Sequence, residues 1–536
     1  MNCVKAPCDG VAAVAVASRP ARTTASGGWI LAATVLASSM TFIDGTVVNV
    51  ALPTLQKVFH ASIVDAQWVV ESYGLFLSAL ILVGGALGDR LGRRAVFLTG
   101  TVIFAAASVA CGLATGIEAL IIARSIQGIG AALLVPGSLA IIAAAFDEKS
   151  RGKAIGTWSG ATAITMALGP VLGGWLIEHG SWRWAFFLNV PLAAAVIVIS
   201  IWHVPESRAA GERKIDWLGA ALATAGLAGI VTGFLESGVR GWHDPLVDGC
   251  LILGVICCAA FLMVESRSAA PMVPLAVFRS AAFSGANLIT LLLYSAIGVF
   301  FFLFPMDLIR VEGYSATAAG AAALPIILLM SFLSRWAGGL VAKYGGRLPL
   351  VVGPLIAAAG FLVFAYLPGC VREFVPTLPG GAASYWACYF PAFVVLGVGL
   401  TITVAPLTTV VMGAVSDDNT GAASGINNAV ARVASVLAIA VLGLVMLGAF
   451  RASLTAGVVR LGLLEASVAT IESRSADLAE LAPPAELSLE QRVALERVVD
   501  ESFGAGLRMV ILCCVGLSLA SALTAWFVIP RRSKSA

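Results

Sequence analysis

Fourteen segments of this chain are apolar over about 20 residues, the length that an α-helix needs to cross the hydrocarbon core of a bilayer. No water reaches the backbone there, so a crossing segment has to satisfy its peptide groups within its own helix. The sequence therefore predicts an all-α polytopic membrane protein with fourteen transmembrane helices. They are expected to begin near Trp29, Ala66, Ala95, Ile117, Lys153, Arg183, Trp217, Asp248, Phe283, Thr317, Pro349, Tyr385, Gly421 and Ala505.

The composition excludes several other classes of protein. Hydrophobic residues make up 59% of the chain and charged residues 12%, with a mean hydropathy of +0.95, whereas a soluble domain is about 25% charged. The net charge is only +3, and no basic cluster is long enough to follow nucleic-acid phosphates. The four histidines lie at the ends of apolar segments, so we expect no metal site and no cofactor. The surroundings of the chain are expected to be a lipid bilayer.

The distribution of Lys and Arg predicts the orientation. Most of these residues in the tails and short loops lie on the side of the N-terminal tail, so the positive-inside rule places both termini in the cytoplasm. Residues 1–28 and 531–536 are then cytoplasmic tails. The long loop 451–503 lies outside; a solvated connector is its usual form, and a lid or partner-binding role is the alternative. Within it, Ser488 to Gln491 has a capping-box pattern that opens an amphipathic stretch.

Two cytoplasmic turns indicate an internal repeat. Gly85–Arg94 follows the second helix and Gly338–Arg347 follows the tenth, and the two share glycine and basic positions when Leu87 is aligned with Leu340. The second copy lacks the acid at position 89 of the first, so we expect it to make a weaker cytoplasmic contact.

Each turn is the second of its own six helices if the seventh and eighth helices are an insertion. The expected organisation is therefore six plus two plus six helices. The N-terminal bundle covers 29–203, the two-helix insertion with its flanking loops covers 204–282, and the C-terminal bundle with the outer loop covers 283–530.

Five stretches in order resemble the major facilitator superfamily, and within it the fourteen-helix drug:proton antiporter family. The stretches are Asp44–Pro53, Gly85–Arg94, Arg124–Gly130, Gly169–Gly174 and Ser181–Pro191. The resemblance covers nearly the whole membrane portion. It implies the major facilitator fold, transport by alternating access and the cytoplasmic membrane of a bacterium, with the chain expected to act as a monomer.

An acidic residue lies deep within the first helix. Asp44 is about 15 residues from the predicted start, or roughly 22 Å along the helix, and burying a carboxylate there costs several kcal/mol unless it is paired, protonated or hydrated. Arg124 and Glu71 are expected in the same layer of the first half. Burial and a nearby arginine act in opposite directions on a carboxylate's proton affinity. We therefore predict a proton or substrate site at these three residues; an interhelical hydrogen-bond anchor is the alternative for Asp44, and a solvated interfacial acid for Glu71.

The resemblance assigns roles to two further motifs. A gating role falls on the cytoplasmic turn, through Gly85, Asp89, Arg90, Gly92, Arg93 and Arg94; simple retention of the loop in the cytoplasm by its arginines is compatible with this role. An antiporter motif falls on Gly169, Pro170, Gly173 and Gly174 of the fifth helix, where small residues allow close helix packing.

Several other polar residues are candidates for lining a cavity or clamping an anionic substrate group. These are Asn49, Gln127, Asp307, Asn427, Asn428 and Arg432. Arg432, and likewise Arg335, has the alternative of extending to the cytoplasmic interface.

The predicted function is proton-coupled export of a small amphipathic drug or metabolite. No nucleotide-binding loop of the GxxxxGK[ST] kind is present, which argues against ATP as the energy source. The alternatives are a dedicated metabolite exporter or an importer of the same fold, and, from another class, a membrane-embedded sensor or enzyme. We find no metal pair or nucleophile–base set in the spans that favours an enzyme.

Overall fold

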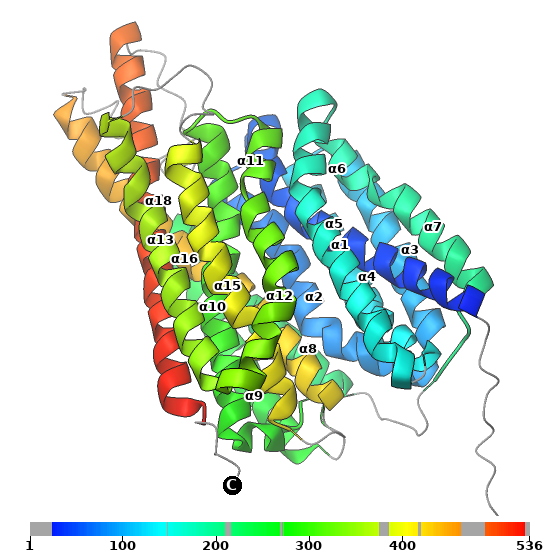
Figure 1. Ribbon diagram of the computed structural model, residues 1–536. Helices are drawn as coiled ribbons and strands as arrows, with labels where there is room; N and C mark the ends of the chain where they lie inside the picture. Colours follow the sequence, from blue (N-terminus) through cyan, green and yellow to red (C-terminus); the bar gives the residue numbers. More distant parts are fainter. Residues whose placement is uncertain are drawn as a thin grey trace, which may run out of the picture.

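The computed structural model describes residues 24–146, 148–208, 216–268, 271, 273–374, 385–415, 420–461 and 488–530, and no strand occurs in these ranges (Figure 1). The first half contains α1 (Thr24–Phe59), α2 (Ile63–Leu91), α3 (Arg93–Leu113), α4 (Ile117–Ala145), α5 (Glu148–His179), α6 (Arg183–Phe187) and α7 (Asn189–His203). Two helices, α8 (Trp217–Arg240) and α9 (Pro245–Arg267), and the short η1 (Leu275–Arg279) follow. The second half contains α10 (Ala281–Arg310), α11 (Ala316–Ala322), α12 (Leu324–Tyr344), α13 (Arg347–Phe374), η2 (Tyr385–Tyr389), α15 (Phe390–Gly413), α16 (Thr420–Arg460) and α18 (Leu489–Val528).

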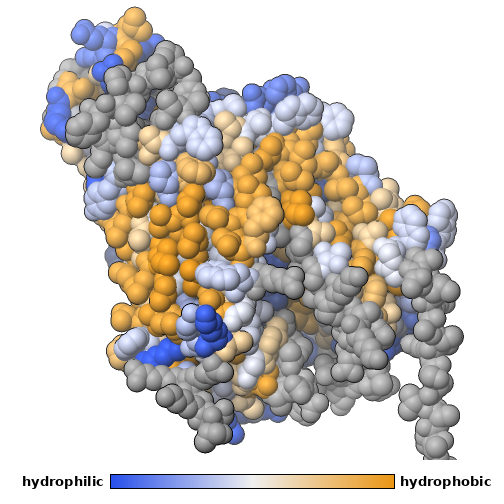
Figure 2. Space-filling model, in the orientation of Figure 1, coloured by the Kyte–Doolittle hydropathy of each residue, from blue (hydrophilic) through white to orange (hydrophobic). Residues whose placement is uncertain are grey.

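The helices match the predicted spans. Within the described residues, thirteen helical segments are long and apolar enough to cross a membrane. The helix α5 stands where the fifth span is predicted and packs along α1. Figure 2 shows apolar side chains forming a broad band around the middle of the molecule, with hydrophilic residues gathered toward its two ends. The predicted all-α membrane fold is confirmed.

The two halves repeat the same helix packing. In the first half α1 packs against α5 and α7, and α4 packs against α2 and α3. In the second half α10 packs against α16 and α18, and α15 packs against α12 and α13 in the same relation. The short helices α6 and α11 precede α7 and α12 because Pro191 and Pro325 lack the N–H that a continuous helix would use.

The cytoplasmic turns of the two halves share one unusual backbone position. Gly92 has a φ of 121° and Gly345 a φ of 77°, and these are the aligned glycines of the repeat. Residues with a side chain rarely adopt this left-handed region, so both turns require glycine there. In each half a new helix begins within two residues after this glycine, at Arg93 and at Arg347.

The inserted helix α8 contacts both halves. Its neighbours include α2 of the first half, α16 of the second half and α9. Trp68 of α2 donates through Nε1 to Glu236 (3.4 Å), and Arg451 of α16 donates to the carbonyl oxygen of Gly238 (3.1 Å). By contrast α9 is largely exposed, and only Val247, Gly254 and Glu265 of it are buried. The expected two-helix insertion is thus attached to the two halves through α8.

The expected outer loop 451–503 is shorter than predicted. The helix α16 continues to Arg460, and α18 begins at Leu489 with a capping box formed by Ser488 and Gln491. Leu454 and Phe503, near the two ends of the expected loop, are buried in the same apolar cluster. Both helices therefore extend beyond the apolar band, as the upper left of Figure 1 shows, because they also pack against each other outside the membrane.

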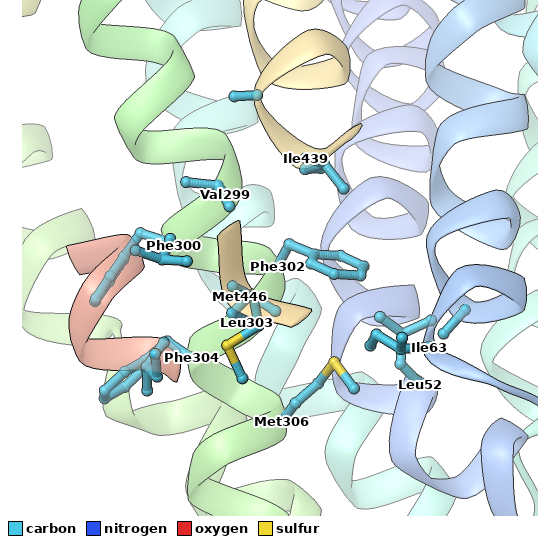
Figure 3. Packing of buried hydrophobic residues seen from close by; sticks show 14 of the residues in the cluster. Leu52, Ile63, Val299, Phe300, Phe302, Leu303, Phe304, Met306, Ile439 and Met446 are labelled. Atoms are coloured by element: carbon cyan, nitrogen blue, oxygen red, sulfur yellow. The ribbon is translucent and has the colours of Figure 1, made fainter. Parts of the chain in front are cut away.

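The outer parts of the two halves meet through apolar side chains. Figure 3 shows Phe302 and Met306 of α10 facing Leu52 of α1 and Ile63 of α2. All four are at most 3% exposed and belong to the largest apolar cluster. The structure is therefore closed on this side of the membrane.

Candidate functional site

A buried polar network surrounds Asp44 at the centre of the first half. The carboxylate is 1% exposed and forms an ion pair with the Nη1 of Arg124, which is also 1% exposed. Its other oxygen accepts hydrogen bonds from Gln127 Nε2 (2.8 Å) and Asn189 Nδ2 (3.1 Å). Ser108 accepts from the same two amides, at 2.8 and 3.3 Å. Helices α1, α3, α4 and α7 are thus joined by one set of contacts.

Arg124 is held by three further groups besides Asp44. Its Nε donates to the carbonyl oxygen of Val69 (3.1 Å) and its Nη1 donates to Gln127 Oε1 (2.7 Å). The guanidinium carbon lies 4.2 Å from the centre of the Tyr73 ring, which adds a cation–π contact. These contacts attach α2 to the network through two residues.

The structure brings Asp44, Arg124 and Gln127 together and places Glu71 apart from them. Asp44 lies against its neighbours in this conformation and is buried. Opposite charges this close stabilise each other inside a low-dielectric interior when hydrogen bonds engage their remaining polar atoms. Removal of either charge would leave the other buried and unpaired, so the pair links the positions of α1 and α4.

Glu71 occupies the face of α2 that packs on α16. Gln67, one turn before it, donates to the carbonyl oxygen of Ile439 (3.2 Å), and Gly74, one turn after it, lies against Val436. The Glu71 side chain is 0% exposed, and neither carboxyl oxygen has a hydrogen-bond partner among the described residues. A carboxylate buried in this way is stable only when it carries a proton. Glu71 therefore lies at the seam between the halves, where α1 and α2 of the first half contact α10 and α16 of the second half. It is an acid without a partner among the described residues.

Sequence reasoning missed three participants in the network. Ser108 and Tyr73 lie in apolar helices and carry no motif that singles them out. Asn189 lies within the Ser181–Pro191 stretch on which the family resemblance rests, but it was not predicted as a site residue. The one available signal was an amide inside an apolar span, where polar groups require partners.

The cytoplasmic turn is organised by an acid from a distant part of the sequence. Asp89 pairs with Arg93 at 2.9 Å, while Glu206 accepts hydrogen bonds from the backbone N–H groups of Arg94 (3.0 Å) and Ala95 (3.1 Å). Glu206 therefore caps the N-terminus of α3. Its carboxyl group occupies the space next to Gly92 where a side chain would point. Arg90 is exposed, and Gly85 lies within α2.

The antiporter motif packs α5 between two other helices. Gly169 and Gly173 lie against α1, at Thr46 and Val47. Gly174 lies against the backbone of Ala316 in α11, and Gly320 of α11 lies against the backbone of Pro170. These small residues therefore let the first and second halves approach backbone to backbone at their outer ends.

The candidate cavity residues are dispersed. Asn427 exchanges hydrogen bonds with Thr290 at 3.0 and 3.2 Å, whereas Asn428 is exposed. Asp307 is buried near the outer end of α10. Asn49 has a buried Oδ1 without a hydrogen-bond partner among the described residues. Arg432 is half-buried on α16. The side chain of Arg335 lies outside the described residues.

The profile of the Major Facilitator Superfamily matches residues 34–439, which include the Asp44 network, the cytoplasmic turn and the antiporter motif. The chain belongs to the Major Facilitator Superfamily. It is similar to the tetracenomycin C resistance and export protein of Streptomyces glaucescens, with 32% identity over 522 residues covering 96% of this chain and 94% of that protein. It is also similar to the multidrug resistance protein Stp of Mycobacterium tuberculosis, with 31% identity over 509 residues covering 94% of this chain and 92% of that protein.

The fold of this superfamily member is also seen in solved structures. A bacterial homologue of the human lysosomal transporter Spinster superposes with a TM-score of 0.59 at 20% identity, covering 96% of this chain and 100% of that one. The chain is therefore a multi-pass transporter of the bacterial cytoplasmic membrane and not an enzyme. Its substrate is a small molecule.

Proposed function

We propose that this transporter exports an amphipathic small molecule in exchange for protons by alternating access. The names of two relatives, a tetracenomycin C resistance and export protein and a multidrug resistance protein, support export of a drug-like small molecule. The observation that carries the proton coupling is Glu71, a fully buried acid without a partner at the seam between the halves.

In this proposal, the protonation of the Glu71 carboxyl group depends on whether the outer side of the seam is open or closed. When the seam opens to the outside, water reaches the carboxyl group and the proton equilibrates with the external solution. When the seam closes, the group enters an apolar layer between α2 and α16, where an ionised carboxylate without a partner costs several kcal/mol. Closure therefore proceeds with the proton bound, and the exchange is completed when the proton leaves to the cytoplasm from a conformation that is open on that side.

Asp44 takes a different role in this proposal from the one expected of it. Both of its oxygens are engaged by Arg124, Gln127 and Asn189 in the closed conformation. It can accept a proton only after Arg124 moves away, so its protonation belongs to another step of the cycle. In the closed state it positions Arg124, and through it Tyr73.

Transport in proteoliposomes tests the coupling. The reconstituted chain is loaded with a fluorescent amphipathic drug, and its movement is followed with and without an imposed pH gradient. We expect the parent to accumulate or expel the drug against its concentration gradient only when the pH gradient is present. Glu71→Gln keeps drug exchange at equal concentrations but loses the gradient-driven part.

Glu118→Gln serves as the matched control, because Glu118 is an exposed acid at the outer end of α4. It should behave as the parent in both assays. Gradient-driven transport that persists in Glu71→Gln would contradict the assignment of Glu71. A parent protein that ignores the pH gradient would contradict proton coupling itself.

A dedicated metabolite exporter and an importer remain the alternative functions. The same vesicles distinguish them, because an importer moves its substrate in the same direction as the proton. An exporter dedicated to one metabolite would ignore unrelated drugs and transport only molecules of one chemical class.

A further inference from the structure

Arg432 carries a positive charge that nothing in the described part of the chain neutralises. It lies on the face of α16 that packs on α2: Gly425 lies against Leu82, and Val436 lies against Gly74. No carboxylate among the described residues forms an ion pair with it. A guanidinium inside a membrane protein is costly unless it is paired or hydrated. The unbalanced charge therefore leaves a place for a counter-ion at this position.

Tyr73 lies opposite Arg432 on α2. Its hydroxyl group is buried and has no hydrogen-bond partner among the described residues. Tyr73 adjoins Gly74, which lies against Val436, one turn from Arg432 on the facing helix. The ring of Tyr73 is fixed from the other side by the guanidinium of Arg124. One hydroxyl and one guanidinium, contributed by different halves, thus lack an acceptor at the same level of the seam.

The neighbouring charges are already balanced within the protein. Arg124 is paired with Asp44, and the amide of Asn427 is engaged with Thr290. Glu71, the other acid on this face of α2, is neutral in the proposed cycle. This leaves Arg432 free to bind an acceptor on a bound molecule.

We propose that Arg432 and Tyr73 bind an anionic oxygen of the transported molecule, either a carboxylate or a phenolate. The guanidinium supplies charge-assisted donors and the hydroxyl supplies one neutral donor, a combination that prefers an anion over its uncharged ester. This inference rests on the proposed function and specifies its substrate class as acidic amphipathic molecules.

The site is open toward the cytoplasmic end of α16. Asn428, one turn closer to that end on the same side of the helix, is exposed, and Arg432 itself is half-buried. An anion arriving from the cytoplasm therefore meets Arg432 before the closed apolar seam. Because Arg432 and Tyr73 belong to different halves, a ligand bound between them contacts both halves at once.

Three anthracene probes of equal ring size test the proposal. The full chain in detergent at neutral pH is titrated with 9-anthracenecarboxylate, its methyl ester and 9-(aminomethyl)anthracene, and binding is followed by fluorescence. We expect the carboxylate to bind at least about tenfold more tightly than the ester or the amine. Arg432→Gln should abolish this preference, Arg432→Lys should keep part of it, and Tyr73→Phe should weaken carboxylate binding about threefold.

The chain offers a matched control pair. Arg508 lies over the ring of Tyr366, with its guanidinium carbon 4.3 Å from the ring centre, and both residues are exposed. Arg508→Gln and Tyr366→Phe remove the same chemical groups elsewhere and should leave the carboxylate preference unchanged. Size-exclusion chromatography shows whether each variant is folded. If Arg432→Gln is not folded, Arg432→Lys provides a variant that keeps the positive charge.

Binding and transport separate this inference from the proposed function. Equal affinity for the three probes, failure of the carboxylate to bind, or a preference that survives Arg432→Gln overturns the anion site. Gradient-driven export of the ester or amine by the parent protein as fast as export of the carboxylate would also overturn it, while leaving proton-driven export intact. A carboxylate preference that depends on Arg432, without any response to a pH gradient, would support the anion site and contradict proton coupling.

Discussion

The guanidinium of Arg124 in α4 donates directly to the carboxylate of Asp44 in α1, and both side chains are 1% exposed. Each of the two charges thus stabilises the other inside the first half. Asp44 also receives two amide hydrogen bonds, which fix the carboxylate with respect to α4 and α7. The pair is a structural connection between helices whatever its part in proton transfer.

Neutralising one member of this pair should destabilise the protein. Asp44→Asn leaves Arg124 buried without its counter-ion, and we expect a loss of about 3–5 kcal/mol in the free energy of unfolding. Chemical unfolding of the purified protein, followed by tryptophan fluorescence, measures this. The double variant Asp44→Asn with Arg124→Gln should recover much of the loss, because no unpaired charge remains. Additive losses in the double variant would show that the two charges act independently.

The cap on α3 predicts a smaller and more local effect. Glu206→Ala removes two hydrogen bonds to backbone N–H groups at the start of α3, which should cost about 1–2 kcal/mol. Glu118→Ala, at an exposed position of α4, should change stability by less than about 0.5 kcal/mol. Thermal unfolding in detergent provides the comparison. If both substitutions lowered the melting temperature equally, Glu206 would have no special role in the turn.

The close contact of α5 and α11 predicts a shift in conformation. A Cβ atom on Gly320 would run into the backbone of Pro170, so Gly320→Ala should separate the outer ends of the two halves. A cysteine introduced at Met306, which is 2% exposed in the closed seam, should then react about tenfold faster with a membrane-impermeant maleimide.

Gly249 provides the control for this separation. It lies in α9, and a Cβ atom there would meet nothing within 4 Å. Gly249→Ala should leave the labelling rate at Met306→Cys unchanged. Unchanged labelling in Gly320→Ala as well would mean that another contact sets the spacing of the outer ends.

Much of the fold followed from hydropathy and from the repeat. Long apolar segments are restricted to helices in a bilayer, so the spans were predictable without any tertiary information. The alignment of Leu87 with Leu340 also identified Gly92 and Gly345 as equivalent, and both have a positive φ. Asp44 and Arg124 were predictable as neighbours because each is a charge at a similar depth in its own helix.

Other features depend on contacts that one sequence does not reveal. Glu206 lies 112 residues from the amide that it caps, and an isolated acid after a helix has many alternative roles. The outer extension of α18 contains Glu490, Arg492 and Glu496. Their charges lower the local hydropathy, so hydropathy alone does not indicate that the helix extends through this segment. Among the described residues, the lack of partners around Glu71 and Arg432 is a property of the packed seam between α2 and α16.

The position of α8 has a mechanical consequence. The helix α8 packs against both α2 and α16. When the halves separate, it must therefore slide along one of these two helices while it moves with the other. Its companion α9 is almost fully exposed to the hydrocarbon of the bilayer. Each transport cycle therefore displaces lipid around α9, and the thickness and lateral pressure of the membrane enter directly into the work of opening the carrier.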